Sequence, residues 1–145
     1  MKIALGCDHA GLPLMEHVRT WLTDAGHELV DFGTHTLESV DYTDFAHKVA
    51  QTVAAGDADR GVVICGTGLG VSYTVNRYKG IRGALCTDTY LAKMARMHNN
   101  ANVLAMGARV IGAGVAEDIV QAFFNTEFEG GRHERRVNKI DEDCV

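Results

Sequence analysis

A cysteine followed by a glycine-rich loop is the part of this sequence best suited to chemistry. The apolar run at residues 62–64 ends at Cys65 and passes directly into a Gly-Thr-Gly-Leu-Gly loop at residues 66–70. Such a run is typical of a buried strand, and the glycines let backbone N–H groups approach a ligand. A cysteine that ends a strand is often an inert core residue, as expected for Cys7 and Cys86. The glycines beside Cys65 instead favour a reactive thiol next to a site that stabilises an oxyanion.

The glycine loop does not match the common nucleotide-binding patterns. It reads G-x-G-x-G, and Val71 occupies the position where the dinucleotide fingerprint requires its third glycine. No lysine follows as in a Walker loop, and no arginine follows that could close the loop over a phosphate as in a thiol phosphatase. The loop therefore predicts an anion cradle of N–H groups at the start of a helix.

Asp8 and His9 follow the first expected strand, at residues 2–7. Ligands of open parallel sheets bind beyond the carboxyl ends of the strands, so Asp8, His9, Cys65 and Thr67 are expected in one neighbourhood. There, a carboxylate can bind sugar hydroxyls and an imidazole can bind an anion. The alternative is that the Asp-His pair forms only a turn and a helix cap.

Further candidates lie in the C-terminal half of the chain. His98 falls on the apolar face of its expected helix, where a buried structural histidine is the common alternative, and the polar Asn99 follows it. Arg132 and Arg136 are four residues apart and share a helical face. Paired arginines suit a bidentate grip on a phosphate, although a solvated charged face is the usual interpretation of such a run.

The elements that must position these residues alternate between strand and helix along the chain. This order predicts an α/β fold of three layers, in one domain over residues 1–145, with a mainly parallel sheet of about five strands and helices on both faces. The strands are expected at residues 2–7, 28–32, 62–65, 81–86 and 102–106.

Helices are expected between these strands from apolar residues that recur at helical spacing. A C-terminal helix follows, in a segment over residues 130–145 whose anchors, Val137 and Ile140, are expected to dock on a second subunit. One of the other helices is expected over residues 70–78. The apolar faces of the remaining helices are Leu14, Val18, Trp21 and Leu22; Phe45, Val49 and Val53; Leu91, Met94 and Ala95; and Val115, Ile119, Ala122 and Phe123.

Composition excludes several classes of function. The chain has 145 residues, 46% of them hydrophobic, and no apolar run near the roughly 18 residues of a membrane span. The acidic Asp8 comes too early for a signal peptide, and the net charge of −5 argues against nucleic acid as a partner. The four cysteines lack the spacing of a zinc site. We therefore expect a cytoplasmic protein with reduced thiols and with no metal, cofactor or membrane partner.

Several motifs, in matching order and spacing, resemble the ribose-5-phosphate isomerase B family, in the group shared with allose- and galactose-6-phosphate isomerases. The resemblance covers nearly the whole chain. It implies a Rossmann-like fold, a metal-free aldose–ketose isomerisation through a cis-enediolate, and a site shared between the subunits of a homodimer, or of a tetramer built from such dimers. The matching segments are residues 6–11, 41–42, 65–70, 76–82, 98–104 and 129–133.

The resemblance also implies a role for each site residue. Cys65 is the expected base that moves a proton between C1 and C2, and Thr67 assists at the hydroxyls. Asp8 and His98 are expected to assist ring opening. The phosphate is expected to bind His9, Arg132 and Arg136, and the sugar is expected to contact Tyr42 and Asn99. The enediolate oxygen is expected to accept hydrogen bonds from the N–H groups of Gly66, Gly68, Leu69, Gly70 and Ser72.

The preferred interpretation is an isomerase that interconverts ribose 5-phosphate and ribulose 5-phosphate. One alternative keeps the chemistry but takes a 6-phosphohexose, either allose 6-phosphate or galactose 6-phosphate. Another alternative is a non-catalytic module that binds phosphate or a nucleotide through the same loop. Cys65 separates the last alternative from the others, because a binding module does not require a thiol at that position.

Overall fold

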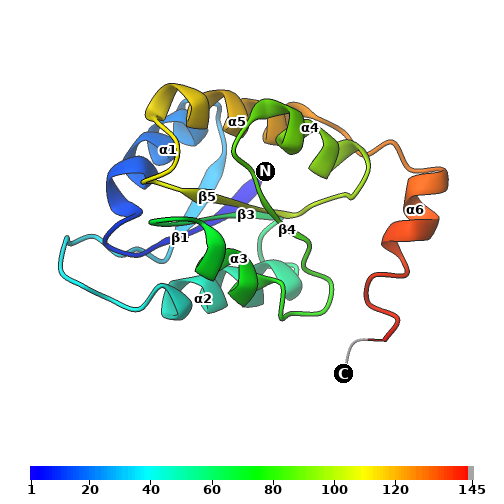
Figure 1. The fold of residues 1–145 in the computed structure, drawn as a ribbon, viewed down its shortest axis with the longest axis horizontal. Coiled ribbons are helices and arrows are strands. Elements are labelled where there is room, and N and C mark those ends of the chain that lie inside the picture. The colour runs from blue at the N-terminus through cyan, green and yellow to red at the C-terminus, as the bar shows by residue number, and fades with distance from the viewer. Residues whose placement is uncertain (144–145) are drawn as a thin grey trace.

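Five parallel strands form the central sheet of the structure, a computed structural model that describes residues 1–143. Their spatial order is β2-β1-β3-β5-β4. The alternation of strands and helices in the sequence predicts such a parallel sheet of about five strands. Figure 1 shows the sheet as the middle of three layers. The strands are β1 (Lys2–Cys7), β2 (Glu28–Asp31), β3 (Arg60–Cys65), β4 (Gly83–Leu85) and β5 (Val103–Gly107).

Helices cover both faces of the sheet (Figure 1). A sixth helix, α6 (Arg132–Val137), stands apart from both layers. Among the described residues, no helix combines the length and the apolar character that crossing a membrane would require. The first face is covered by α1 (Leu12–Asp24), α4 (Thr89–Met97) and α5 (Ala113–Asn125), and the second by α2 (Tyr42–Ala54) and α3 (Leu69–Val75).

The central strand β3 divides its side chains between two cores, because successive residues of a strand point to opposite faces. Val62 and Ile64 join the larger core, with residues of α1 and α5. Val63 and Cys65 join the smaller core, with residues of α2 and α3. The sequence of β3 therefore decides that the Cys65 side chain lies on the α2 and α3 side of the sheet.

The direction of the chain crossings reverses between β1 and β3. From β1 the chain crosses to β2 on one side, whereas from β3 it moves away in the other direction, towards β4 and β5. Open α/β sheets bind ligands outside the carboxyl ends of the strands at such a switch point. Because Cys7 pairs with Ile64, the segment after β1 lies beside the segment after β3.

The fourth strand is shorter than residues 81–86, the range expected from the apolar pattern. Side chains take over the backbone pairing around it: Asn102 Oδ1 accepts from Arg82 N at 2.8 Å, and Asn76 Oδ1 accepts from Gly83 N at 2.9 Å. The helix expected over residues 70–78 likewise ends at Val75, where Asn76 forms its C-cap. In both cases side-chain hydrogen bonds replace the regular backbone pattern.

Three expected apolar anchors are exposed in the structure. Leu91 and Val115 each lie in the first turn of a helix, on the side away from the sheet, and Ile140 lies beyond the end of α6. Helix α4 instead buries Ala92, Ala95 and Arg96. The expectation that Leu91 and Val115 face the core was therefore wrong, because the helices begin in a register that turns these side chains outward.

Candidate active site

Cys65 lies at the carboxyl end of β3 with its sulfur against the backbone of the glycine loop. Its Sγ accepts a hydrogen bond from the N–H of Gly68 at 3.2 Å, and only 4% of the residue is exposed. Gly68 adopts a left-handed conformation with φ of 80°, which glycine tolerates without strain. An N–H directed at the sulfur stabilises negative charge there, and a cysteine that accepts a proton must first carry this charge as a thiolate.

The rest of the glycine loop is held by the segment that follows β5. Ala108 N donates to the Cys65 carbonyl and Arg109 N to the Gly66 carbonyl, both at 2.9 Å. Gly107 packs directly against Thr67, since a Cβ at position 107 would lie 2.5 Å from the Thr67 carbonyl carbon and oxygen. The loop is therefore fixed in place before any ligand arrives.

The expected oxyanion donors fall into two groups. Gly68 N donates to the Cys65 sulfur, Leu69 N to Thr67 Oγ1 at 3.2 Å, and Ser72 N to the Gly68 carbonyl at 3.1 Å. Among the described residues, no acceptor stands opposite the N–H groups of Gly66 and Gly70. These last two donors remain available to an anion at the start of α3.

Tyr42, the first residue of α2, lies on the same loop. A Cβ at Gly70 would come within 2.5 Å of Tyr42 Cζ and within 2.9 Å of its hydroxyl oxygen. The tyrosine ring therefore occupies the space that the missing side chain of Gly70 leaves. Tyr42 is also 39% exposed, so its ring is accessible from solvent beside the loop.

Asp8 and His9 lie beside the end of β3, as the strand-end argument predicts. Asp8 is buried and accepts a hydrogen bond from Gly11 N at 2.9 Å, while its own N–H donates to the Ile64 carbonyl at 3.3 Å. His9 Nδ1 accepts from Val40 N at 3.2 Å. A neutral His9 consequently carries its proton on Nε2 and can donate it to an anion.

Arg109 is a candidate residue that the sequence reasoning missed. Its guanidinium lies over Gly66, where an added Cβ would be 3.4 Å from Nη1. Arg109 comes two residues after the end of β5, so the strand-end argument that selected Asp8 would also have selected it. The structure thus places an exposed guanidinium beside the glycine loop at this edge of the sheet.

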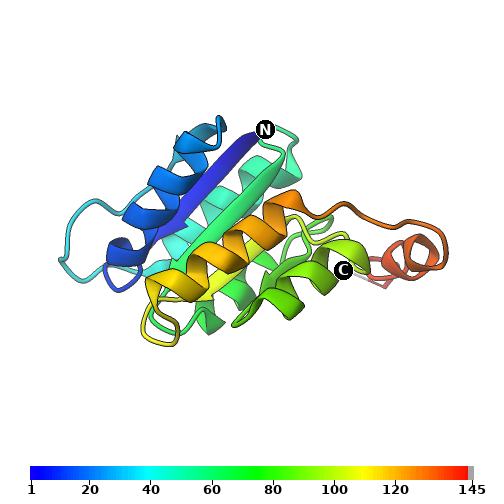
Figure 2. The same ribbon diagram turned by 90° about the horizontal axis from the view of Figure 1, so that it is seen from above.

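The other expected residues lie at the opposite edge. Helix α4 starts after the carboxyl end of β4 and leads back to the amino end of β5, and His98 and Asn99 follow its last turn. Arg132 and Arg136 are exposed on α6. Figure 2 shows α6 beyond the last turn of α4, whereas the arrow of β1 points the other way. A single chain therefore does not bring these four residues to Cys65.

His98 forms a cluster with two residues that the sequence reasoning left out. Its ring stacks on that of His133, with centroids 4.2 Å apart and planes 12° apart. His133 Nε2 lies 3.2 Å from a carboxylate oxygen of Glu129. The ligand atoms of the three residues lie within 4.8 Å of one another, and two histidines with a glutamate are a set that zinc binds. The nearly parallel rings, however, prevent their in-plane lone pairs from converging on one ion.

The other described cysteines are core residues, as expected. Burial raises the pKa of both Cys7 and Cys86 to about 12, so these thiols stay protonated at neutral pH. The fourth cysteine, Cys144, lies outside the described residues. Of the described thiols, Cys65 alone accepts a hydrogen bond from a backbone N–H of the glycine loop.

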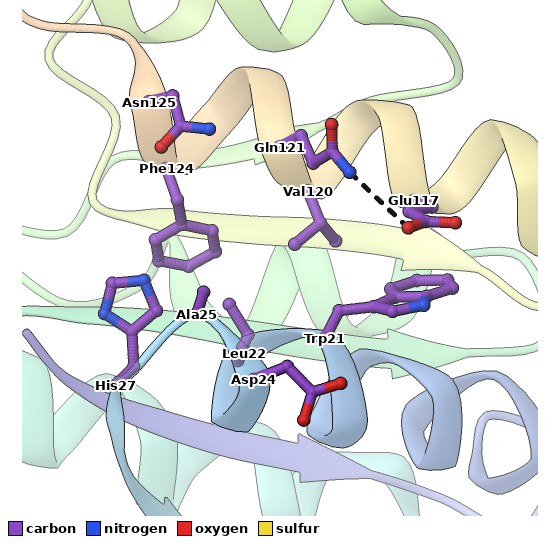
Figure 3. Close-up of a pocket in the computed structure, with 10 residues that line it drawn as sticks. All are labelled: Trp21, Leu22, Asp24, Ala25, His27, Glu117, Val120, Gln121, Phe124 and Asn125. Carbon is purple, nitrogen blue, oxygen red and sulfur yellow. Dashed lines mark hydrogen bonds between the residues drawn. The ribbon is translucent and has the colours of Figure 1, made fainter.

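A groove of about 410 Å³ between α1 and α5 is distinct from both groups of residues (Figure 3). Its walls are Trp21 and Leu22 on α1 and Val120 and Phe124 on α5, and the Glu117 and Gln121 side chains are hydrogen-bonded at its rim. It contains none of the expected site residues. We therefore assign the candidate active site to the Cys65 loop.

Comparisons with known proteins identify the family of this chain. The sequence model of the Ribose/Galactose Isomerase family matches residues 3–140. Ribose-5-phosphate isomerase B of Escherichia coli is 45% identical, over 96% of this chain and 93% of its own. The solved structure of ribose-5-phosphate isomerase B from Clostridium thermocellum has a TM-score of 0.96 and 54% identity, over 98% of this chain and 96% of its own. A galactose-6-phosphate isomerase subunit of Clostridium acetobutylicum is 38% identical, over 98% of this chain and 83% of its own. The chain is therefore a member of the ribose/galactose isomerase family of enzymes.

Proposed function

We propose that this enzyme interconverts ribose 5-phosphate and ribulose 5-phosphate, with Cys65 as the base. The observation that carries the proposal is the Cys65 sulfur, held 3.2 Å from the Gly68 N–H at the mouth of a glycine loop. Family relatives named ribose-5-phosphate isomerase B match nearly the full chain. A free catalytic thiol also suits a reducing compartment such as the cytoplasm.

The reaction begins with ring opening, because ribose 5-phosphate is mainly a furanose in water. A proton must leave the hydroxyl on C1 while another is delivered to the ring oxygen. Asp8 and His98 carry out these two transfers in our proposal. Both have suitable chemistry, since a carboxylate and an imidazole are common general acids and bases.

Proton transfer between the two carbons follows in the open chain. Cys65 removes the proton from C2, and the electron pair moves through C1 onto O1, which gives the cis-enediolate. The N–H groups of Gly66 and Gly70 stabilise the oxyanion. Cys65 then returns the proton to C1, while Thr67 helps the O2 proton pass to O1, so that C2 becomes the carbonyl. No other reactant is consumed.

We further propose that the working unit is a homodimer with shared sites. His98, Asn99, Arg132 and Arg136 lie at the edge of the sheet opposite Cys65. A two-fold axis can place this edge of one subunit against the Cys65 loop of the other, and the reverse. The partner would then supply the ring-opening histidine and the two arginines, which bind the phosphate together with His9 and Arg109.

A side-by-side assay tests the proposed substrate. Purified enzyme is supplied with ribose 5-phosphate, allose 6-phosphate or galactose 6-phosphate, and the ketose product is measured for each. We expect the highest kcat/KM with ribose 5-phosphate. A higher value with either hexose would replace the pentose assignment, and binding of all three without turnover would indicate a binding module.

A further inference from the structure

We propose that His133, held by Glu129, is a positioning residue for His98 in the ring-opening step. The inference rests on the function proposed above, in which His98 transfers a proton to or from the cyclic sugar. His133 itself makes no contact with the sugar in this proposal. It acts by restricting the orientation of the neighbouring imidazole.

The first support is the stack itself. His98 is the C-cap residue of α4 and is partly exposed, so its own helix does not restrict rotation of its ring. His133 is 7% exposed and covers one face of that ring, at 4.2 Å between centroids and nearly parallel. A flat face at this distance limits rotation of the His98 ring about its Cβ–Cγ bond.

Glu129 in turn holds His133 in place. Its carboxylate lies 3.2 Å from His133 Nε2, and its backbone N–H donates to the Met97 carbonyl at 3.1 Å. Glu129 is thus attached both to the last turn of α4 and to the ring beneath His98. Because Nε2 is engaged by the carboxylate, His133 is better placed to orient His98 than to act on a ligand through that atom.

The end of α4 is also held from the inside of the molecule. Arg96 is buried, and its guanidinium donates to the Ala101 carbonyl, to Asn100 Oδ1 at 3.0 Å and to the Thr126 carbonyl at 3.3 Å. Thr126 begins the segment that carries Glu129. Both rings of the stack are therefore mounted on one fixed unit, made of the end of α4 and the segment after α5.

A fixed orientation of the His98 ring matters because the rate of proton transfer depends steeply on the position of the transferring group. A displacement of about 1 Å can lower a rate by about 100-fold. If the stack serves this purpose, its loss must affect the step that involves the ring of the sugar. It must leave proton transfer between C1 and C2 unchanged, since that step belongs to Cys65.

Two assays separate these steps. Conversion of ribose 5-phosphate requires ring opening. Exchange of the C1 proton of ribulose 5-phosphate with D₂O does not, because O5 carries the phosphate and the ketose cannot close a furanose. His133→Ala is expected to lower kcat for conversion by about 10- to 100-fold and to leave the exchange rate within about twofold of wild type. His133→Phe, which keeps an aromatic face, should retain more conversion than His133→Ala.

The matched control is Glu134→Gln, an exposed position on the same helix, which should leave both rates unchanged. Unchanged conversion by His133→Ala would overturn the proposal. An equal fall in both rates, with His133→Phe no better, would also overturn it, since His133 would then support the whole site. Failure of the wild-type enzyme to exchange the C1 proton would instead contradict the proposed function.

Discussion

The three described thiols sit in two different environments. Cys7 and Cys86 are buried within the apolar core, and this burial raises the pKa of each to about 12. Cys65 is also buried, in the smaller core, but its sulfur accepts a hydrogen bond from an N–H of the glycine loop. A thiol reacts as its thiolate, so a residue with a pKa near 12 is almost entirely unreactive at pH 8.

This difference predicts selective alkylation of the native enzyme. In a Cys144→Ser background, iodoacetamide at pH 8 should modify Cys65 well before Cys7 or Cys86, and activity should fall in step. Peptide mass spectrometry over a time course measures the three rates separately. Equal modification of all three thiols would contradict the environments described above.

Replacement of Cys65 tests its role as the base. Cys65→Ala should lower kcat by about 10²- to 10⁴-fold, the usual contribution of a general base. The affinity for ribose 5-phosphate, measured by calorimetry, should change little, because the phosphate contacts remain. Cys86→Ala serves as the control, with near-normal kcat, and a near-normal kcat for Cys65→Ala would exclude this thiol as the base.

Individual site residues could be predicted from the sequence where the topology alone brings them together. Asp8, His9, Cys65 and Thr67 follow neighbouring parallel strands, so they had to share an edge. Arg109 and His133 were missed. The strand-end argument could have found Arg109, which follows β5. The stack of His133 on His98 could not be found in this way, because it joins segments that are 35 residues apart.

At the scale of elements, close backbone packing shapes the site. Gly107, at the end of β5, leaves room for Thr67 in the loop after β3. Gly11 similarly approaches the Ile64 carbonyl, where an added Cβ would lie 2.3 Å from the oxygen. These contacts join the loops that carry the candidate residues to the ends of neighbouring strands.

Gly107→Ala should therefore disturb the site through the backbone. The added methyl group would press on Thr67, and we expect a loss of about 1–3 kcal/mol in the free energy of unfolding, together with a lower kcat. Gly114→Ala is the control, since a Cβ there meets nothing within 4 Å. Chemical denaturation and the isomerase assay measure both effects. Equal free energies of unfolding and equal kcat values for the two variants would show that the close contact between Gly107 and Thr67 does not matter.

The sequence predicted the central elements better than those at the edge of the sheet. Residues 2–7 form β1 as expected, because a buried parallel strand is a continuous apolar run. At the edge, β4 keeps only three residues, since the Asn76 and Asn102 side chains bind the backbone where it begins, at Gly83 and Arg82. Such long-range side-chain hydrogen bonds leave no periodic pattern in the sequence.

At the scale of the whole molecule, the expected site residues occupy opposite edges of one sheet. Asp8, Tyr42 and Cys65 gather at the carboxyl edge, whereas His98 and the arginines of α6 lie beyond the amino edge. For His98 the sequence could have revealed this separation, because a segment between a helix and the next parallel strand lies at the amino edge. Within one chain, His98 and the two arginines are therefore away from Cys65.

The central claim is that these two edges form one isomerase site across a dimer. Its most direct test is to mix the inactive variants Cys65→Ala and His98→Ala under conditions that exchange subunits, and to assay ribose 5-phosphate conversion. Each hybrid dimer would hold one site with both halves intact, so the mixture should recover activity that neither variant has alone. A mixture that stays inactive, although mass spectrometry detects hybrid dimers, would contradict the account.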